Sequence, residues 1–505
     1  MKNKFSAVLI LLILFCSINI SCKKGFLDSN NDTNRVTDAN ITPELIFTQA
    51  EVAVGNKSVG ASAADVGATT TIQFIHDWMG YMAQNGDYAP SSQELTYNID
   101  YSFSDILFTR YYSTLFDLHQ AEVKGLEKGD TAVSAASIIL SSKLFQELVD
   151  LYGDIPYSEA FSIGKTSHPK YDKAQDIYNA LQLRLDDAIK YFNKTIPARF
   201  VKADVINIGN ATKWIKFANT LKLQLLIRQS EVAGLNYTAE ISKIMANGGV
   251  LGAGETISVN PGYVNSTNKQ SPYYAIYGYT PTGNRAITSH NANAYIINIL
   301  KSNNDPRISR FFTDVSGKYV GDKFGDQQAN LPIGANSSYF GPGLVTSATQ
   351  DQWLMTSFES LFLKAEAIAR GWIPGDANQA YTDAVTESFV YIGVPDAINA
   401  AASYLAPGNA SNWSNAGTTV SKQVKFIAFQ KYIANTAMDA LESYSDQRRL
   451  HFLTDNNYIS ISPAKISNTL PLRILYPQSE YTTNADNVNK VGTINIFSSK
   501  IFWEP

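Results

Sequence analysis

Apolar residues recur every three to four positions along much of this 505-residue chain, which is the spacing of one face of an α-helix. The clearest stretch runs from Asp105 to Glu127. After the turn at 128–130, the same spacing returns from Ala132 to Leu151. Because this connection is so short, we expect two antiparallel helices that form a hairpin.

The same arrangement recurs, so that four helical hairpins are predicted in all. The further pairs are 175–192 with 214–229, 353–370 with 378–391, and 421–434 with 438–452. Another helix is predicted from Pro43 to about Gly55, since Thr42 can cap its first turn and proline fits the first helical position. Repeated hairpins of about 35 to 50 residues are typical of tetratricopeptide-like units.

Two long segments lack this helical spacing. Residues 248–352 are rich in Gly, Asn, Ser, Tyr and Pro, and only 291–301 is predicted to be helical within them. The tail from 456 to 505 is similarly irregular, with a strand-like piece at 494–497. Long irregular segments on a rigid scaffold usually carry function, so binding residues are expected there.

The amino terminus has the pattern of a targeting sequence. Residues 7–15 are continuously apolar and follow two lysines, but a membrane-spanning helix needs about 20 such residues. Ser21 directly before Cys22 resembles a bacterial lipoprotein cleavage site, and lipid on Cys22 would anchor the mature chain. We therefore predict a signal peptide over 1–21, a lipidated polar tether over 22–40 and a single helical domain over 41–505. An ordinary secreted protein cleaved nearby is the alternative.

Composition excludes several classes of function. Charged residues are only 17% and the formal net charge is −4 without a basic block, so nucleic acid is not an expected partner. Both cysteines lie in the first 22 residues, which excludes a disulfide scaffold or a cysteine nucleophile in the body. The five histidines lack zinc-site spacing, and there is no P-loop or GxSxG sequence. No cofactor is predicted; a structural calcium ion and a pair of hydrolytic carboxylates stay open.

A tyrosine cluster in the long irregular segment is the first candidate binding site. Residues 271–284 read SPYYAIYGYTPTGN, and their prolines and glycines argue against a buried helix or strand. Sugar rings stack their CH faces on aromatic rings, and their hydroxyls pair with amide, carboxylate and guanidinium groups. The cluster is therefore predicted to bind a glycan or a peptide, through Tyr273, Tyr274, Tyr277, Tyr279, Asn284 and Arg285. The alternative is that these tyrosines pin the loop onto the helices.

The second candidate is the segment 74–88, which reads FIHDWMGYMAQNGDY. Trp78 and Tyr81 lie near the end of a helical pattern, and Asn85, Asp87 and Tyr88 follow in a polar turn. A helix end beside a polar turn is a plausible rim for a ligand, although Trp78 could equally be a core residue. Residues 339–342 are a third candidate. Asp446, Arg448 and Arg449 are predicted to form a buried charge network instead of a ligand site.

Motifs spread over nearly the whole chain resemble, in order, the SusD/RagB family of nutrient-binding outer-membrane lipoproteins, and its second SusD-like branch in particular. The most specific is LVDLYGDIPYSEAF at 148–161, in which Gly153 can end a helix, Asp154 can brace the turn and Pro156 prevents the helix from resuming. The others are CKKGFLD from Cys22, TRYYSTLFDLHQAE at 109–122, TKWIKFANTLKLQLLIR at 212–228, NDPRISRFF at 304–312, SFESLFLKAEAIARGW at 357–372, ESYSDQRRLHF at 442–452 and LPLRILYPQSE at 470–480.

The resemblance implies a mainly α fold in which tetratricopeptide-like hairpins form a right-handed scaffold and long irregular loops hold the ligand. It also implies capture of oligosaccharides without catalysis, and their delivery to a SusC-like TonB-dependent transporter in the outer membrane. The lipid anchor would hold the protein there, facing the cell exterior. A peptide ligand, as in RagB-like proteins, is the alternative; a surface glycoside hydrolase and a tetratricopeptide scaffold for protein partners are two others. The family's binding residues lie in variable loops, so the site residues above rest on loop chemistry alone.

Overall fold

The computed structural model describes residues 41–59, 73–89, 91–103, 105–162 and 164–505. The predicted signal peptide, the predicted lipidation site at Cys22 and the predicted tether fall before residue 41 and so lie outside these ranges. Residues Pro43–Pro505 form one compact unit, and everything below concerns that unit.

The first predicted hairpin is confirmed as α5 (Asp105–Glu127) and α6 (Thr131–Tyr152). Gly129 takes a φ of +71° in the turn, and the Asp130 carboxylate accepts a hydrogen bond from the Val133 amide to cap α6. Helix α6 has the length and hydropathy of a membrane-spanning helix, yet 94% of its most apolar window is buried inside the protein. It is therefore a core helix.

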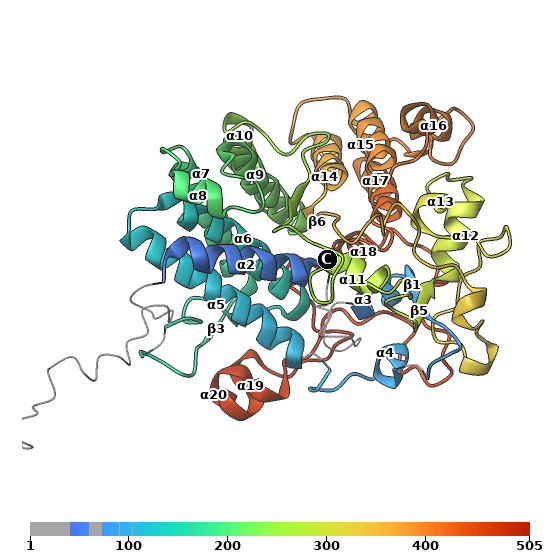
Figure 1. Cartoon of the computed structure of the whole chain (residues 1–505), viewed down its shortest axis with the longest axis horizontal. Helices are drawn as coiled ribbons and strands as arrows, with labels where there is room; N and C mark the ends of the chain where they lie inside the picture. The colour runs from blue at the N-terminus through green and yellow to red at the C-terminus, as the bar shows by residue number, and fades with distance from the viewer. Residues whose placement is uncertain (1–40, 60–72, 90, 104, 163) are drawn as a thin grey trace, which may run out of the picture. The chain divides into compact units, whose positions relative to one another are not determined.

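A helix that precedes this hairpin in the chain packs on one side of it, and helices that follow it pack on the other side (Figure 1). Helix α2 (Pro43–Val59) lies against α5, and α7 (Ala174–Phe192) lies between α6 and α9 (Ala211–Arg228). The later helices repeat the pattern with two more hairpins, and α9 contacts α14 to join the two groups. These later helices are α14 (Ser357–Ala369), α15 (Ala377–Tyr391), α16 (Ala397–Tyr404), α17 (Val420–Ala434) and α18 (Ala440–Leu450).

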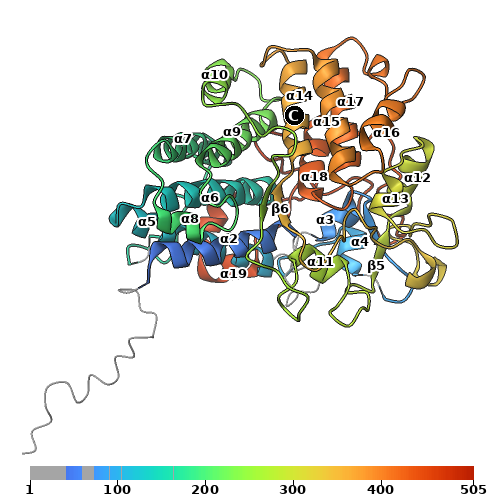
Figure 2. The ribbon, with the colours of Figure 1, turned by 45° about the horizontal axis from the view of Figure 1, so that its top comes forward.

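Shorter elements and loops connect the hairpins. Many of them gather on the side of α18 where α3, α4, α11, α12 and α13 lie, in both ribbon views (Figures 1 and 2). The short helices are α3 (Gln73–Trp78), α4 (Ser92–Thr96), α8 (Ala198–Ala203), α10 (Thr238–Ala246), α11 (Pro272–Tyr277), α12 (Ala294–Ser302), α13 (Ile308–Phe311), α19 (Gln478–Thr483) and α20 (Ala485–Val488).

The described strands form three antiparallel pairs. They are β1 (Met82–Gln84) with β5 (His290–Ala292), β2 (Ile155–Pro156) with β3 (Tyr171–Asp172), and β4 (Ile257–Val259) with β6 (Gln352–Met355). The third pair corrects the helix predicted from Trp353, because 352–355 pairs with β4 and α14 begins only after Thr356 caps it. The strand-like tail piece at 494–497 is not a strand, and a turn begins at residue 496.

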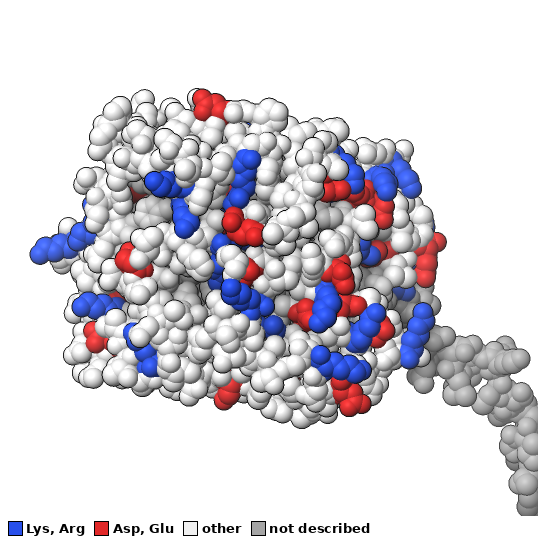
Figure 3. Space-filling view, turned by 180° about the vertical axis from the view of Figure 1, so that it is seen from behind, with Lys and Arg blue, Asp and Glu red and all other residues white. Residues whose placement is uncertain are grey.

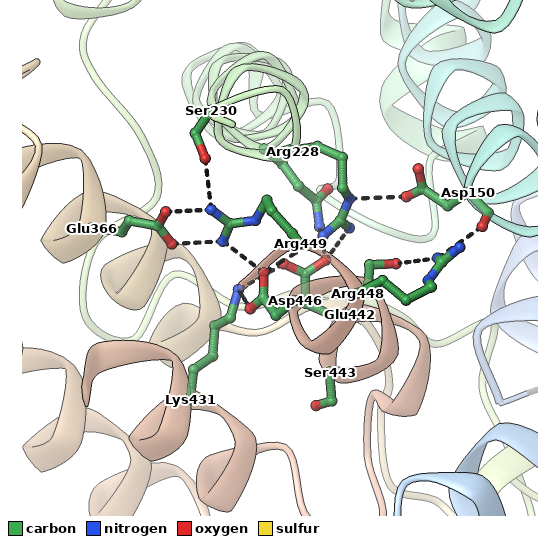
Figure 4. Close-up of polar contacts among 12 residues, drawn as sticks. Asp150, Arg228, Ser230, Glu366, Lys431, Glu442, Ser443, Asp446, Arg448 and Arg449 are labelled. Carbon is green, nitrogen blue, oxygen red and sulfur yellow. Dashed lines mark hydrogen bonds and ion pairs between the residues drawn. The ribbon is translucent and has the colours of Figure 1, made fainter. Parts of the chain in front are cut away.

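A buried charge network joins five of the helices, as the sequence predicted for Asp446 and Arg449 (Figure 4). Arg449 on α18 donates to both carboxylate oxygens of Glu366 on α14, at 2.6 and 2.8 Å, and to Asp446 at 2.8 Å. Arg228 on α9 pairs with Glu442 on α18 at 2.5 Å and with Asp150 on α6 at 3.1 Å. Lys431 on α17 bridges Glu442 and Asp446, at 2.7 Å each. The helices are thus fixed to one another by directional contacts as well as by apolar packing.

Candidate functional site

Strand pairing brings the two candidate segments together although about 200 residues separate them in the sequence. Strand β1 pairs antiparallel with β5, so that Gln84 faces His290 and Met82 faces Ala292. The chain leaves β1 toward Asn85 at the same end where it enters β5 from Thr288. The polar turn of the second candidate therefore lies beside the residues that follow the tyrosine cluster.

Hydrogen bonds fix this turn from within. The buried side-chain amide of Asn85 donates to the Thr288 carbonyl and to Asn291 Oδ1, both at 2.8 Å. Asp87 accepts a hydrogen bond from the Gly334 amide at 2.9 Å, and the hydroxyls of Tyr88 and Thr288 lie 2.6 Å apart. Asn85 is fully buried, so the expectation that it contacts a ligand is wrong: it braces the turn from beneath, while Asp87, Tyr88 and Thr288 are exposed.

Arg285 links this turn to the tyrosine cluster. Its guanidinium donates to the Gly334 carbonyl at 2.8 Å and lies 4.4 Å from the ring centroid of Tyr339. Tyr279 forms a bridge with Arg285 in the backbone, and its ring centroid is 6.1 Å from Tyr339 and 6.3 Å from Tyr274. The third candidate, 339–342, therefore contributes the buried ring on which Arg285 rests.

We call the exposed and half-buried residues of this region the loop surface. It combines three tyrosine rings with a carboxylate, an amide, a guanidinium and a hydroxyl. Its members are Asp87, Tyr88, Tyr274, Tyr279, Asn284, Arg285 and Thr288.

The expectation that the other four aromatic candidates reach a ligand is wrong, because Trp78, Tyr81, Tyr273 and Tyr277 are at most 1% exposed. Trp78 donates its indole N–H to the Glu94 carbonyl, and the Tyr81 hydroxyl donates to the Tyr432 carbonyl. The Tyr273 hydroxyl donates to the Ala437 carbonyl. These contacts attach the loops to the rest of the protein. For Tyr273 this is the alternative interpretation given above, in which the tyrosines of the cluster pin the loop onto the helices.

Tyr273 and Tyr277 are buried because residues 272–277 form the helix α11. The prolines and glycines of this segment predicted that no buried helix would form there. Pro272 occupies the first helical turn, where proline is favourable, and Gly278 ends the helix. Residues four apart share one helix face, so Tyr273 and Tyr277 both point inward, with ring centroids 4.8 Å apart. Tyr274 lies on the adjacent face and stays half-buried.

A buried cluster of titratable groups, which the sequence did not predict, includes His290 of β5. His290 Nε2 is 3.2 Å from the Asp77 carboxylate, and Ser289 lies 2.8 Å from the other ring nitrogen. Burial raises the pKa of Asp77 to about 6 and that of Glu94 well above its ordinary value. Burial also lowers the pKa of His76 to about 3, which keeps that imidazole neutral. The carboxyls of Asp77 and Glu94 are covered by protein and do not face the loop surface.

The face of the molecule shown in Figure 3 has no large patch of one charge. On the face seen in Figure 3, positive and negative side chains are interspersed and most of the area is uncharged. Within the described ranges, no three His, Cys, Asp or Glu side chains come together as metal ligands would. The loop surface balances the Arg285 guanidinium with the Asp87 carboxylate and adds tyrosine rings and an amide, a combination that suits neutral, hydroxyl-rich molecules.

The architecture defines a helical-hairpin protein whose irregular loops present its exposed aromatic and polar groups. The model of the SusD-like_2 family, described as starch-binding and associating with the outer membrane, matches residues 34–477. The chain belongs to this family, which confirms the resemblance and the mainly α fold.

Solved structures share the fold at low sequence identity. A SusD homologue from Bacteroides fragilis is 20% identical with a TM-score of 0.73, and the match covers 92% of this chain and all of that one. A chitin-binding SusD homologue from Flavobacterium johnsoniae is 22% identical with a TM-score of 0.73, covering 90% and 98%. A SusD-like protein from Bacteroides thetaiotaomicron is 22% identical with a TM-score of 0.71, covering 91% and 98%. Among curated protein sequences, none matches this chain.

Proposed function

We propose that this protein binds oligosaccharides at the cell surface and passes them to a SusC-like TonB-dependent transporter, without catalysing a reaction. A lipid on Cys22 would hold it at the outer membrane, facing outward. The observation that carries the proposal is the loop surface, on which one exposed and two half-buried tyrosine rings lie among hydrogen-bonding side chains. Membership in a family described as starch-binding and outer-membrane-associated supports the same class of ligand and the same location.

The chemistry of the loop surface fits a sugar ring. Tyr88 is 44% exposed and can stack on the CH face of a pyranose, while its hydroxyl stays fixed by Thr288. Arg285 uses one donor on the Gly334 carbonyl, which leaves further N–H groups of the guanidinium for sugar hydroxyls. Asp87 and Asn284 add an acceptor and an amide. Because the ring and the guanidinium are held before a ligand arrives, little side-chain entropy is lost on binding.

Titration calorimetry with chitohexaose and maltohexaose tests the proposal. The chitin-binding homologue motivates the first ligand, and the description of the family motivates the second. We expect Tyr88→Ala to weaken binding about tenfold, which corresponds to about 1.4 kcal/mol; for comparison, stacking of a nucleobase on one aromatic ring contributes roughly 1–3 kcal/mol. Tyr101→Ala is the matched control, because Tyr101 is 43% exposed but packs against Tyr481, away from β1.

Two results would count against the proposal. If neither sugar binds and defined peptides do, the ligand is a peptide, as in RagB-like importers. If maltohexaose or chitohexaose is shortened during incubation, the protein is a hydrolase. Membrane fractionation of Cys22→Ser cells tests the anchor: the wild-type protein should remain with the outer membrane and the variant should not. Co-purification from detergent with a TonB-dependent transporter tests the partner.

A further inference from the structure

A cavity lies at the other end of the β1–β5 pair, away from the loop surface. Strand β5 ends at Ala292, and Asn293 begins α12 by accepting a hydrogen bond from the Tyr295 amide. The cavity has a volume of about 600 Å³ and lies between α12, residues 323–324 and residues 455–461. This volume is within the range of small-molecule sites, about 300–1,000 Å³. We call it the α12 pocket.

Three segments that are far apart in the sequence are fixed around this pocket. The Asn293 side chain donates to the Met82 carbonyl at 3.0 Å, which attaches the start of α12 to β1. The Ala294 amide donates to the Asp322 carbonyl at 2.8 Å, which places Lys323 and Phe324 beside the same helix. The Tyr295 hydroxyl donates to Asp455 at 3.3 Å, and its ring centroid is 5.6 Å from that of Tyr458. The walls are thus formed before any ligand binds.

The lining is rich in side-chain amides around an aromatic floor. Tyr295 and Phe324 supply rings that are mostly buried, and Ile299 adds an apolar patch. Asn298 and Asn456 also line the pocket, and their side-chain amides make no hydrogen bond to another residue in the described ranges. Each free amide both donates and accepts hydrogen bonds, which is what a ligand hydroxyl requires.

The charges of the lining point to a neutral ligand. Lys323 contributes one positive group and Asp455 one negative group, so the pocket favours neither a phosphate nor a polyamine. Side-chain amides that line the same cavity as buried rings instead suit a ring-shaped molecule with hydroxyls on its rim. We propose that the α12 pocket is a second saccharide-binding site, separate from the loop surface; its ligand class rests on the proposed function.

The two sites are close but distinct. Strands β1 and β5 have three residues each, and at about 3.3 Å per residue their two ends are roughly 7–10 Å apart. The loop surface begins at the end with Gln84 and His290, and the α12 pocket at the end with Met82 and Ala292. A substitution in either site can therefore leave the other folded, provided that the strand pair itself is unchanged.

Titration calorimetry of four variants with maltohexaose and chitohexaose separates the two sites. Asn298→Trp fills the exposed rim of the pocket, and Lys301→Trp is the control because Lys301 is exposed on the same helix but does not line the pocket. Thr288→Trp covers the loop surface, and a double variant combines it with Asn298→Trp. We expect two binding events for the wild type and Lys301→Trp, one for each single site variant with at least a tenfold loss of the other, and none for the double variant.

The outcomes distinguish the two proposals. If the wild type shows one binding event that Asn298→Trp leaves unchanged and Thr288→Trp abolishes, the α12 pocket is not a saccharide site and the loop surface stands. If Asn298→Trp alone abolishes binding, the pocket is confirmed and the loop surface is wrong. A crystal soaked with the same sugar should show density beside Tyr295; a pocket that takes up only a peptide overturns the saccharide assignment.

Discussion

Replacing Glu366 by glutamine should destabilise the protein strongly at neutral pH and hardly at all in acid. Glu366 is 2% exposed and accepts two hydrogen bonds from Arg449 and one from Arg370. Although burial alone would raise the pKa of Glu366, Arg449 and Arg370 more than offset it and lower this pKa from 4.5 to about 2. At about 1.4 kcal/mol per pH unit, the ionised carboxylate contributes about 3 kcal/mol of stability. Loss of one partner in a buried ion pair typically costs about 3–5 kcal/mol, which agrees.

The sign of the pH dependence follows from the lowered pKa. A carboxylate with a folded-state pKa below its unfolded value stabilises the protein fully above about pH 4.5, and this contribution is lost as the pH falls toward 2. Glutamine resembles the protonated acid. The difference in unfolding free energy between wild type and Glu366→Gln should therefore be about 3 kcal/mol at pH 7 and approach zero near pH 2.

Urea unfolding of the mature protein, followed by tryptophan fluorescence, measures this difference at several pH values. The comparison holds only if both proteins have the same m-value. Glu231→Gln is the matched control, because Glu231 also pairs with Arg370, at 2.7 Å, but is 33% exposed; it should cost less than about 1 kcal/mol. The reasoning is refuted if Glu366→Gln costs no more than Glu231→Gln at pH 7, or if its cost is the same at pH 3 as at pH 7.

Three other predictions concern stability. Gly153→Ala should lower the free energy of unfolding by about 1–3 kcal/mol in the same urea assay, because Gly153 has a φ of +79° and a Cβ there would lie 2.8 Å from Arg473 Nη1; an unchanged midpoint would contradict this. Trp78→Ala should cost about 3–5 kcal/mol, since the ring is fully buried, and a variant of wild-type stability would mean that the ring is not core. Burial raises the pKa of Asp322 to about 7, so its ionised form destabilises the fold above that pH and has no effect below about pH 4. Asp322→Asn should therefore melt at a higher temperature than wild type at pH 8.5 and at the same temperature at pH 4, and a lower melting temperature at pH 8.5 would disprove the argument.

The helical part of this fold could be predicted because its signals are local. The hairpin of α5 and α6 follows from apolar spacing and a short turn. The motif around residue 153 also worked as predicted: Gly153 ends α6, and the Asp154 carboxylate accepts a hydrogen bond from the Ala174 amide at 2.9 Å. Each of these features depends on residues within about 20 positions in the sequence.

The residues of the candidate site could be located only as segments. Whether a tyrosine of 273–279 faces inward or outward depends on what lies across from it, and Tyr273 packs 4.6 Å from the ring of Trp353, 80 positions later. Strands β1 and β5 have three residues each, which is too short for an alternating pattern to be visible. The sequence therefore identified the two regions, and several of their exposed members, but not which side chains support the others.

The pairing of β1 with β5 also determines when in folding the loop surface can exist. Asn85 and Asn291, which hydrogen-bond to each other, are 206 positions apart, so they meet only after a very long loop has closed. The helical hairpins between them rely on local contacts and can form earlier. A chain that has formed its helices but not this strand pair would look nearly native by circular dichroism and would still lack the loop surface. If the loop surface binds glycans as proposed, this binding is a more stringent measure of complete folding than helix content.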